Sequence, residues 1–156
     1  MKKFLLVLAC VMIAHPNQLP SALEQFPSQW QDIELVIDPN LNVKENTVSC
    51  QKDIWMGNAK LACDARRVRE GWLIQLKPTN LFDGDTLIFL IPNDPAIKVK
   101  FLGIHFTRIA FMRFLIPITS GSLILKSEKL VLGESVNAVF NLNGEHSISG
   151  TLSQAL

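Results

Sequence analysis

Residues 136–152, VNAVFNLNGEHSISGTL, decide the fold. Apolar residues alternate there with asparagines, apart from Val139, and this period of two is typical of a β-strand with one buried face. The apolar positions are Val136, Ala138, Phe140 and Leu142, followed on the return strand by Ile148, Gly150 and Leu152. Between the two runs, Asn143-Gly144 favours a type I′ turn, which needs positive φ at both central residues. The stretch predicts an antiparallel hairpin that turns at Asn143-Gly144.

Short strands bounded by turn residues recur through the rest of the chain. Turn signals such as Asp38-Pro39-Asn40 and Pro78 close several of these runs. The strand candidates are residues 33–37, 72–77, 86–91, 97–101, 123–125 and 130–132. Residues 86–91 are continuously apolar, as expected of a fully buried strand. The sequence predicts an all-β protein, a single antiparallel β-sandwich or a partly open barrel.

Residues 101–118 are more apolar than a solvent-facing strand requires. A helix would place Arg108 and Arg113 about 140° apart, and a plain strand would send them to opposite faces. A bulge between the arginines, or a bend into two strands, resolves the conflict. The segment, with Phe111 and Phe114, is either sheet core or a contact surface for a protein or lipid. Two arginines disfavour insertion through a membrane.

The N-terminus has the layout of a secretory signal peptide. Lys2 and Lys3 precede the uncharged apolar residues 4–14. Eleven residues of helix rise about 16 Å, roughly half of a hydrocarbon core, so we expect no stable transmembrane span. Cleavage is expected between Ala14 and Ala22. The chain divides into a signal peptide (1–14), an N-terminal arm (15–31) and a β domain (32–156).

A lipoprotein is the alternative to a cleaved secretory precursor. Residues 7–10 end in Cys10 and loosely resemble a lipobox, although only five apolar residues precede the cysteine. Either arrangement predicts an exported protein, periplasmic or extracellular, and the short lysine-led signal suits a bacterial envelope.

Charge and length bound the class of protein. The chain carries 15 basic and 14 acidic residues, and loss of Lys2 and Lys3 leaves a mature net charge of −1. A chain with this charge balance lacks the net positive charge that is typical of nucleic-acid-binding proteins. The mature length of roughly 140 residues suits one domain.

Cys50 and Cys63 remain after removal of the signal peptide. An even number of cysteines in an exported chain predicts a disulfide. A hairpin centred between Met56 and Gly57 would set the two cysteines opposite one another, and closing that loop would add about 3 kcal/mol of stability. Trp55 and Met56 would then form an apolar tip, available for contact or folded back onto the core.

No catalytic motif stands out. The chain has no P-loop, dinucleotide fingerprint, nucleophile elbow or H-E-x-x-H pair, and no cofactor is predicted. Three histidines, His15, His105 and His146, leave open a metal-dependent enzyme, in which His15 would become a chelating terminus after cleavage at Ala14.

The only basic cluster is Arg66, Arg67 and Arg69. Arginine suits bidentate recognition of carboxylate or phosphate, so a lipid headgroup or acidic partner is one interpretation. Asp64 and Glu70 flank the cluster, and a solvated or salt-bridged surface is the other.

These observations favour an exported protein with a non-catalytic binding role toward a protein, a lipid or an envelope component. The expected contact surfaces are the Trp55-Met56 tip, the arginine cluster, and the strand from Phe111 to Phe114. Two alternatives remain. One is the metal-dependent enzyme, and the other is a structural subunit of a surface assembly that joins its neighbours through an exposed edge strand.

Overall fold

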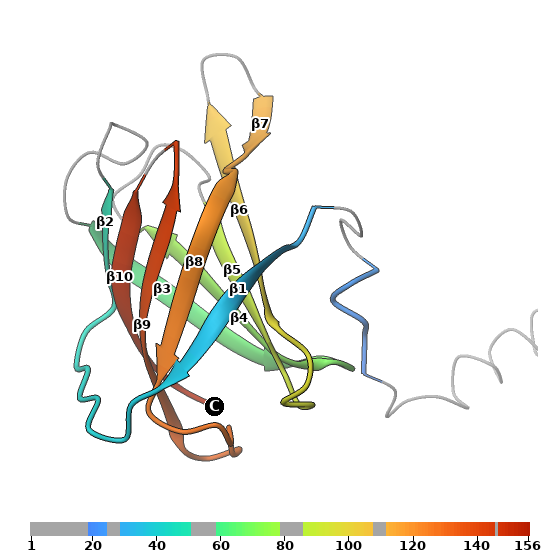
Figure 1. The fold of residues 1–156 in the computed structure, drawn as a ribbon, viewed down its shortest axis with the longest axis vertical. Coiled ribbons are helices and arrows are strands. Elements are labelled where there is room, and N and C mark those ends of the chain that lie inside the picture. Colours follow the sequence, from blue (N-terminus) through green and yellow to red (C-terminus); the bar gives the residue numbers. More distant parts are fainter. Residues whose placement is uncertain (1–18, 25–28, 51–58, 79–85, 108–111, 146) are drawn as a thin grey trace, which may run out of the picture.

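The computed structural model describes residues 19–24, 29–50, 59–78, 86–107, 112–145 and 147–156. These residues form ten β-strands and no helix, which confirms the all-β prediction (Figure 1). The strands are β1 (Gln31–Ile37), β2 (Thr47–Cys50), β3 (Ala59–Arg67), β4 (Gly71–Pro78), β5 (Thr86–Pro92), β6 (Val99–Thr107), β7 (Met112–Leu115), β8 (Ile118–Leu125), β9 (Ser135–Gly144) and β10 (Ile148–Ala155).

The strands make one curled sheet, a half-barrel, in the order β1-β8-β9-β10-β2-β3-β4-β5-β6-β7. Its strands follow one another in a continuous ladder, so the sheet is closer to the predicted partly open barrel than to two stacked sheets. β1 bridges the two halves of the curl, because its first residues pair with β6 and its last residues pair with β8. The β1–β8 pairing is parallel, which departs from the antiparallel arrangement that the sequence predicts.

The main core lies inside the curl. Three buried phenylalanines from different strands meet at its centre, with the ring of Phe89 5.4 Å from that of Phe101 and 5.2 Å from that of Phe140. Such tilted ring pairs stabilise a core beyond the area they bury. Nearly every residue of β5 is buried, as its continuous apolar run predicts.

A second, smaller cluster packs on the outer face of β4 and β5. It consists of Ala22, Val68, Leu73 and Leu90, with Leu23, Trp30 and Ile88 packed around it. Successive side chains of a strand point to opposite faces, so Leu90 serves this cluster while Phe89 serves the main core. The outer cluster explains why β5 has apolar residues on both faces.

The arm residues that cover this cluster are fixed by the turn between β3 and β4. The Ser21 hydroxyl donates to the Glu70 carboxylate, and the Ala22 N–H donates to the same group at 3.0 Å. The Arg69 N–H donates to the carbonyl of Pro20 at 2.9 Å. Residues 20–22 are therefore held to the fold by both backbone and side chain.

The C-terminal hairpin forms, but its turn is not at Asn143-Gly144. Ile148 pairs with Leu142, which centres the connection on Glu145. A two-residue turn would have set Ile148 opposite Val139. Because a shift of this kind reverses the face to which a strand's side chains point, it would have turned Ile148 out of the core. Burial of the return strand overrides the local turn preference.

Gly144 has another role in the structure. It pairs with Ile118 at the start of β8, and a Cβ at this position would lie 2.5 Å from the Pro117 carbonyl oxygen. The glycine therefore permits a close approach between two strands, a function of glycine distinct from turn formation.

The predicted register, with Cys50 directly opposite Cys63, does not form, and no disulfide is found among the described residues. β2 pairs with β3 through Thr47–Lys60 and Val48–Ala59, six residues away from the register that would set the cysteines opposite one another. Cys63 instead lies opposite Leu76 of β4 and carries a free, half-buried thiol. β2 is only four residues long and meets just the beginning of β3, so the expected symmetric hairpin does not form.

Candidate functional site

Strand direction divides the loops between two ends of the curled sheet. The pairs Cys50–Ile148, Thr86–Ile104 and Ile118–Gly144 place the β2–β3, β4–β5, β6–β7 and β9–β10 connections at one end, here named the hairpin end. The β1–β2, β3–β4, β5–β6 and β8–β9 connections lie at the opposite end. The expected contact residues Trp55, Met56 and Phe111 lie outside the described residues.

The β6–β7 hairpin projects beyond the neighbouring strands at the hairpin end (Figure 1). Its outer strand β7 is strongly apolar and solvent-exposed. Met112 is 50% exposed, Phe114 45% and Leu115 42%. Consecutive residues of a strand point to opposite faces, so Phe114 and Leu115 are exposed apolar side chains on the two different faces of the hairpin. The bend into two strands, one of the arrangements left open for residues 101–118, is the one that forms.

The base of this hairpin is well anchored. Ile116, directly after β7, is buried, and its N–H donates to the carbonyl of Gly103 at 2.9 Å. The Gln31 side chain accepts from the Ile118 N–H at 2.8 Å and donates to the Ile116 carbonyl at 3.2 Å. Gly103 leaves no room for a larger residue, since a Cβ there would lie 2.9 Å from the Ile116 Cβ. The exposed residues thus stand on a fixed support.

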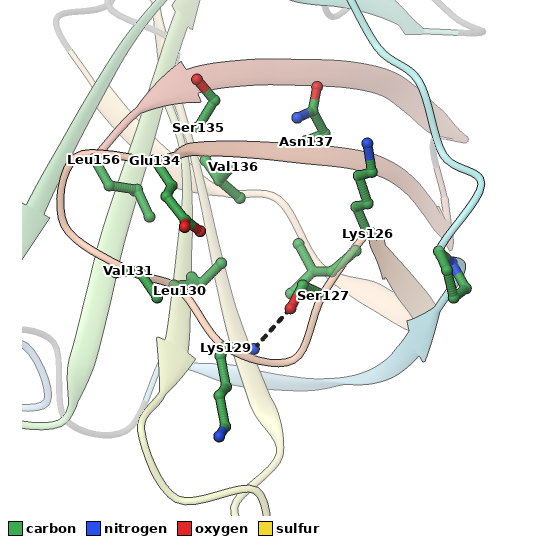
Figure 2. A pocket seen from close by; sticks show the side chains of 12 residues that line it. Lys126, Ser127, Lys129, Leu130, Val131, Glu134, Ser135, Val136, Asn137 and Leu156 are labelled. Carbon is green, nitrogen blue, oxygen red and sulfur yellow. Dashed lines mark hydrogen bonds between the residues drawn. The ribbon is translucent and has the colours of Figure 1, made fainter.

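The opposite end has a cavity of about 440 Å³ beneath the β8–β9 loop (Figure 2). Its lining mixes apolar and polar side chains: Pro39, Leu125, Lys126, Ser127, Lys129, Leu130, Val131, Glu134, Ser135, Val136, Asn137 and Leu156. The loop is braced by a hydrogen bond from the Lys129 N–H to the Ser127 hydroxyl at 3.3 Å. The volume is in the range of small-molecule sites. No sequence motif predicted this cavity.

A second cavity of about 260 Å³ lies on the other side of the same loop and shares Lys129, Leu130 and Val131 with the first. Trp72 lines it. Opposite charges sit together around the larger cavity, where Glu134 offsets the lysines. The mixture of apolar and oppositely charged side chains in the two linings does not indicate a particular class of ligand.

The arginine cluster does not converge on a ligand. The Arg67 guanidinium lies 5.5 Å from the centre of the Trp72 ring, and the Arg69 guanidinium pairs with the Glu24 carboxylate at 3.6 Å. Arg66, one position before Arg67 in β3, points to the other face of the strand. The cluster also lies at the end opposite to Phe114. Arg67 makes a cation–π contact with Trp72, and Arg69 helps to bind the arm through Glu24. The contact with Trp72 was not predicted from the sequence.

The cysteine and histidine candidates show no reactive arrangement among the described residues. Burial, with a smaller contribution from the negative charge of Asp64, raises the pKa of the Cys63 thiol to about 12. The thiol is therefore neutral at pH 7 and a poor nucleophile. His105 lies in β6 opposite Phe114. Within the described ranges, no three His, Cys, Asp or Glu side chains gather as metal ligands. His15 and His146 fall outside those ranges, and the metal-enzyme hypothesis stays a prediction.

No family model, curated protein or solved structure matches this chain. In the part of the chain that the structure describes, no helix has the length and apolarity to cross a membrane. The function must therefore be inferred from the residues of the protein itself. The most distinctive described surface is the hairpin end, with its exposed apolar side chains.

Proposed function

We propose that this protein is an exported, non-catalytic binding protein whose contact surface is the hairpin end. The observation that carries the proposal is the exposure of Met112, Phe114 and Leu115 on a firmly anchored strand. A group of large apolar side chains exposed at one place on a protein surface is typical of an interaction site. Aromatic residues and methionine are also enriched at the centres of binding surfaces.

The exported location rests on the N-terminal sequence. Lys2 and Lys3 with the apolar residues 4–14 support secretion to the periplasm or the cell exterior. There, a protein, a lipid or another envelope component would be within reach of the hairpin end.

A photo-crosslinking amino acid at position 114 tests the proposal in the exported full chain. We expect adducts with an envelope component from position 114 and none from a matched probe at Leu132, which is 71% exposed at the opposite end. Equal adduct yields from the two positions, or none from either, would remove the hairpin end as the contact surface.

A structural subunit of a surface assembly is the second candidate. Among the described strands β7 has β6 as its only neighbour, so its outer edge has backbone groups free to pair with another strand. An assembly of this kind predicts concentration-dependent oligomers in sedimentation experiments. Arg113→Pro would abolish them, because the register places the N–H of this residue on the outer edge of β7. A monodisperse monomer at high concentration would contradict this candidate.

A further inference from the structure

We propose that one edge of β3 binds a second copy of this chain, whose own β3 adds to it in an antiparallel register centred on Ala65. This surface is separate from the hairpin end, so the inference goes beyond the proposed function. It is carried by the free edge of β3, by the backbone groups that point out of that edge, and by the order of charges along the strand.

One edge of β3 is free over most of its length. On one side, β4 pairs with β3 from Leu61 to Arg67. On the other side, β2 reaches only Ala59 and Lys60. β10 passes near β3 but forms no ladder with it, and no other described strand pairs with residues 61–67 on that side. A free strand edge of this length is a template for pairing with another chain.

The register with β4 identifies the backbone groups at the free edge. Val68 and Gly71 exchange both of their backbone hydrogen bonds, at 2.9 and 3.3 Å, and so form a hydrogen-bonded pair at the turn. Hydrogen-bonded and non-hydrogen-bonded pairs alternate along an antiparallel ladder. Cys63, Ala65 and Arg67 therefore direct their N–H and C=O groups away from β4. No backbone hydrogen bond among the described residues uses these groups, so they are available to a second strand.

A two-fold pairing centred on Ala65 uses all of these groups. Ala65 then faces Ala65 of the partner subunit, and Cys63 of each copy faces Arg67 of the partner subunit. Each of these positions directs its backbone groups out of the free edge, so each facing pair forms two N–H···O=C bonds. Sheet residues of both copies then continue across the interface in one ladder.

The same register sets opposite charges against one another. Asp64 and Arg66 are exposed, and neither forms an ion pair among the described residues. Centring on Ala65 places Asp64 of each copy opposite Arg66 of the partner subunit, in the non-hydrogen-bonded positions where facing Cα atoms are only about 4.5 Å apart. Opposite charges that face one another across strands stabilise the pairing, and like charges destabilise it.

The charges also select this register over its neighbours. A shift of the pairing centre by one residue toward either end would set Asp64 opposite Asp64 of the partner subunit, or Arg66 opposite Arg66 of the partner subunit. Only the pairing centred on Ala65 matches both charges at once. An edge that is complementary to itself under a two-fold rotation fits a second copy of the chain, because two-fold dimers are the commonest assemblies of identical subunits. One strand from each copy buries less area than a stable interface needs, so we expect a weak dimer.

Sedimentation equilibrium of the mature full chain, from about 10 µM to about 1 mM, tests the inference. We expect a reversible dimer. Asp64→Arg and Arg66→Asp each set like charges opposite one another in both halves of the interface, and each is expected to weaken the dimer about tenfold or more. Glu34→Arg and Lys98→Asp make the same changes in charge at exposed positions outside β3 and are expected to dimerise as the wild type does.

A mixture of the two β3 variants gives the sharpest measurement. The Asp64→Arg chain is basic at both positions and the Arg66→Asp chain is acidic at both, so the two chains complement one another in the proposed register. We expect each variant alone to be largely monomeric and the equimolar mixture to form a heterodimer at least as tight as the wild-type dimer, within about threefold. A restored dimer also shows that both variants are folded.

Monomers at every concentration, in the wild type and in the mixture, overturn the inference. A wild-type dimer that both β3 variants leave intact overturns it too, and loss of that dimer on Arg113→Pro would assign it to the edge of β7. Crosslinking at position 114 reports on the hairpin end and does not depend on these results. Failure of the β3 dimer therefore leaves the proposed function standing, and failure of the crosslink leaves the β3 dimer standing.

Discussion

Two apolar surfaces lie outside the main core, and the chain treats them differently. The outer face of β4 and β5 presents Leu73 and Leu90, which are 6% and 1% exposed because the arm covers them. The β6–β7 hairpin presents Phe114 with nearly half of its surface in solvent. Both surfaces are built on regular antiparallel strands, so strand geometry does not explain the difference.

The difference lies in what covers each surface. The arm is held to the β3–β4 turn by directed hydrogen bonds to Glu70 and from Arg69, so its place is specified. No described segment covers the hairpin, whose base is nevertheless fixed by Gln31. An apolar surface that is rigidly supported and left uncovered by its own chain is one that an external partner is expected to cover. The comparison predicts large stability effects at the covered surface and small ones at the uncovered surface.

The largest effect is expected from Leu90→Ala. Leu90 is almost completely buried beneath the arm, and truncation of a buried leucine costs about 2–5 kcal/mol through lost transfer free energy and the cavity left behind. Urea unfolding, followed by circular dichroism, measures this change. A loss below about 1 kcal/mol would mean that the arm does not seal the outer cluster in solution.

The next effect is expected from shortening the arm. A chain that begins at Leu23 lacks the hydrogen bonds that Ser21 and Ala22 donate to Glu70 and the one that Pro20 accepts from Arg69. Each such bond contributes about 0.5–1.5 kcal/mol. We expect a loss of about 2 kcal/mol relative to a chain that begins at Leu19, which keeps these contacts. Equal urea midpoints for the two chains would show that residues 19–22 are dispensable.

The arm also bears on the export that we propose for this protein. Cleavage after Ala22 would remove the residues that bind the β3–β4 turn, whereas cleavage after Ala14 would keep them. We therefore expect cleavage at the earlier of the two positions left open by the sequence. N-terminal sequencing of the exported protein is expected to find a start before Pro20, and a start at Leu23 would contradict this.

The sequence predicted those features of the fold that depend on local periodicity. Alternation in residues 136–152 revealed the C-terminal hairpin, and the apolar run at 86–91 revealed a buried strand. Registers were predicted less well, because they depend on distant partners. Gly144 allows the close approach of β8. Most of β3 pairs with β4 and only its first residues pair with β2, and no local pattern near Cys50 or Cys63 indicates this.

The candidate site residues show the same difference between local features, which the sequence predicts, and contacts between distant residues, which it does not. Phe114 was identified because its segment is too apolar for an ordinary exposed strand, and this property is local. The meeting of the arm with Glu70, the contact of Arg67 with Trp72, and the cavity beneath the β8–β9 loop join residues far apart in the chain. Only the topology brings such groups together, so periodicity and motif searches do not detect them.

A smaller effect on the covered surface is expected from acid. Burial acts to raise the pKa of Glu70, but hydrogen bonds from the Ser21 hydroxyl and from the N–H groups of Ala22, Glu70 and Leu23 outweigh it and lower the pKa from 4.5. The charged carboxylate therefore stabilises the folded arm above about pH 4.5, and this contribution is lost as pH falls through the lowered pKa. Because solvent still reaches and screens the half-buried carboxylate, we expect less than about 1 kcal/mol.

Limited proteolysis of the arm between pH 6 and pH 3 measures this contribution. In the wild type, cleavage near residue 22 is expected to increase as the carboxylate is protonated. Glu70→Gln is expected to be cleaved at the higher rate throughout and to show little dependence on pH in that interval. A variant that keeps the wild-type pH profile would show that another group fixes the arm.

The smallest effect on folding is expected at the uncovered surface. Phe114→Ser removes an aromatic ring that is already 45% exposed and is absent from the clusters of buried residues. Exposed substitutions of this kind usually change stability by less than about 0.5 kcal/mol, and the removal of exposed apolar area also favours solubility. We expect urea unfolding of the variant to match the wild type, whereas Leu73→Ser, at the covered surface, unfolds at clearly lower urea. A destabilisation by Phe114→Ser comparable to that of Leu73→Ser would mean that the ring is buried in solution, and the hairpin would then be core rather than contact surface.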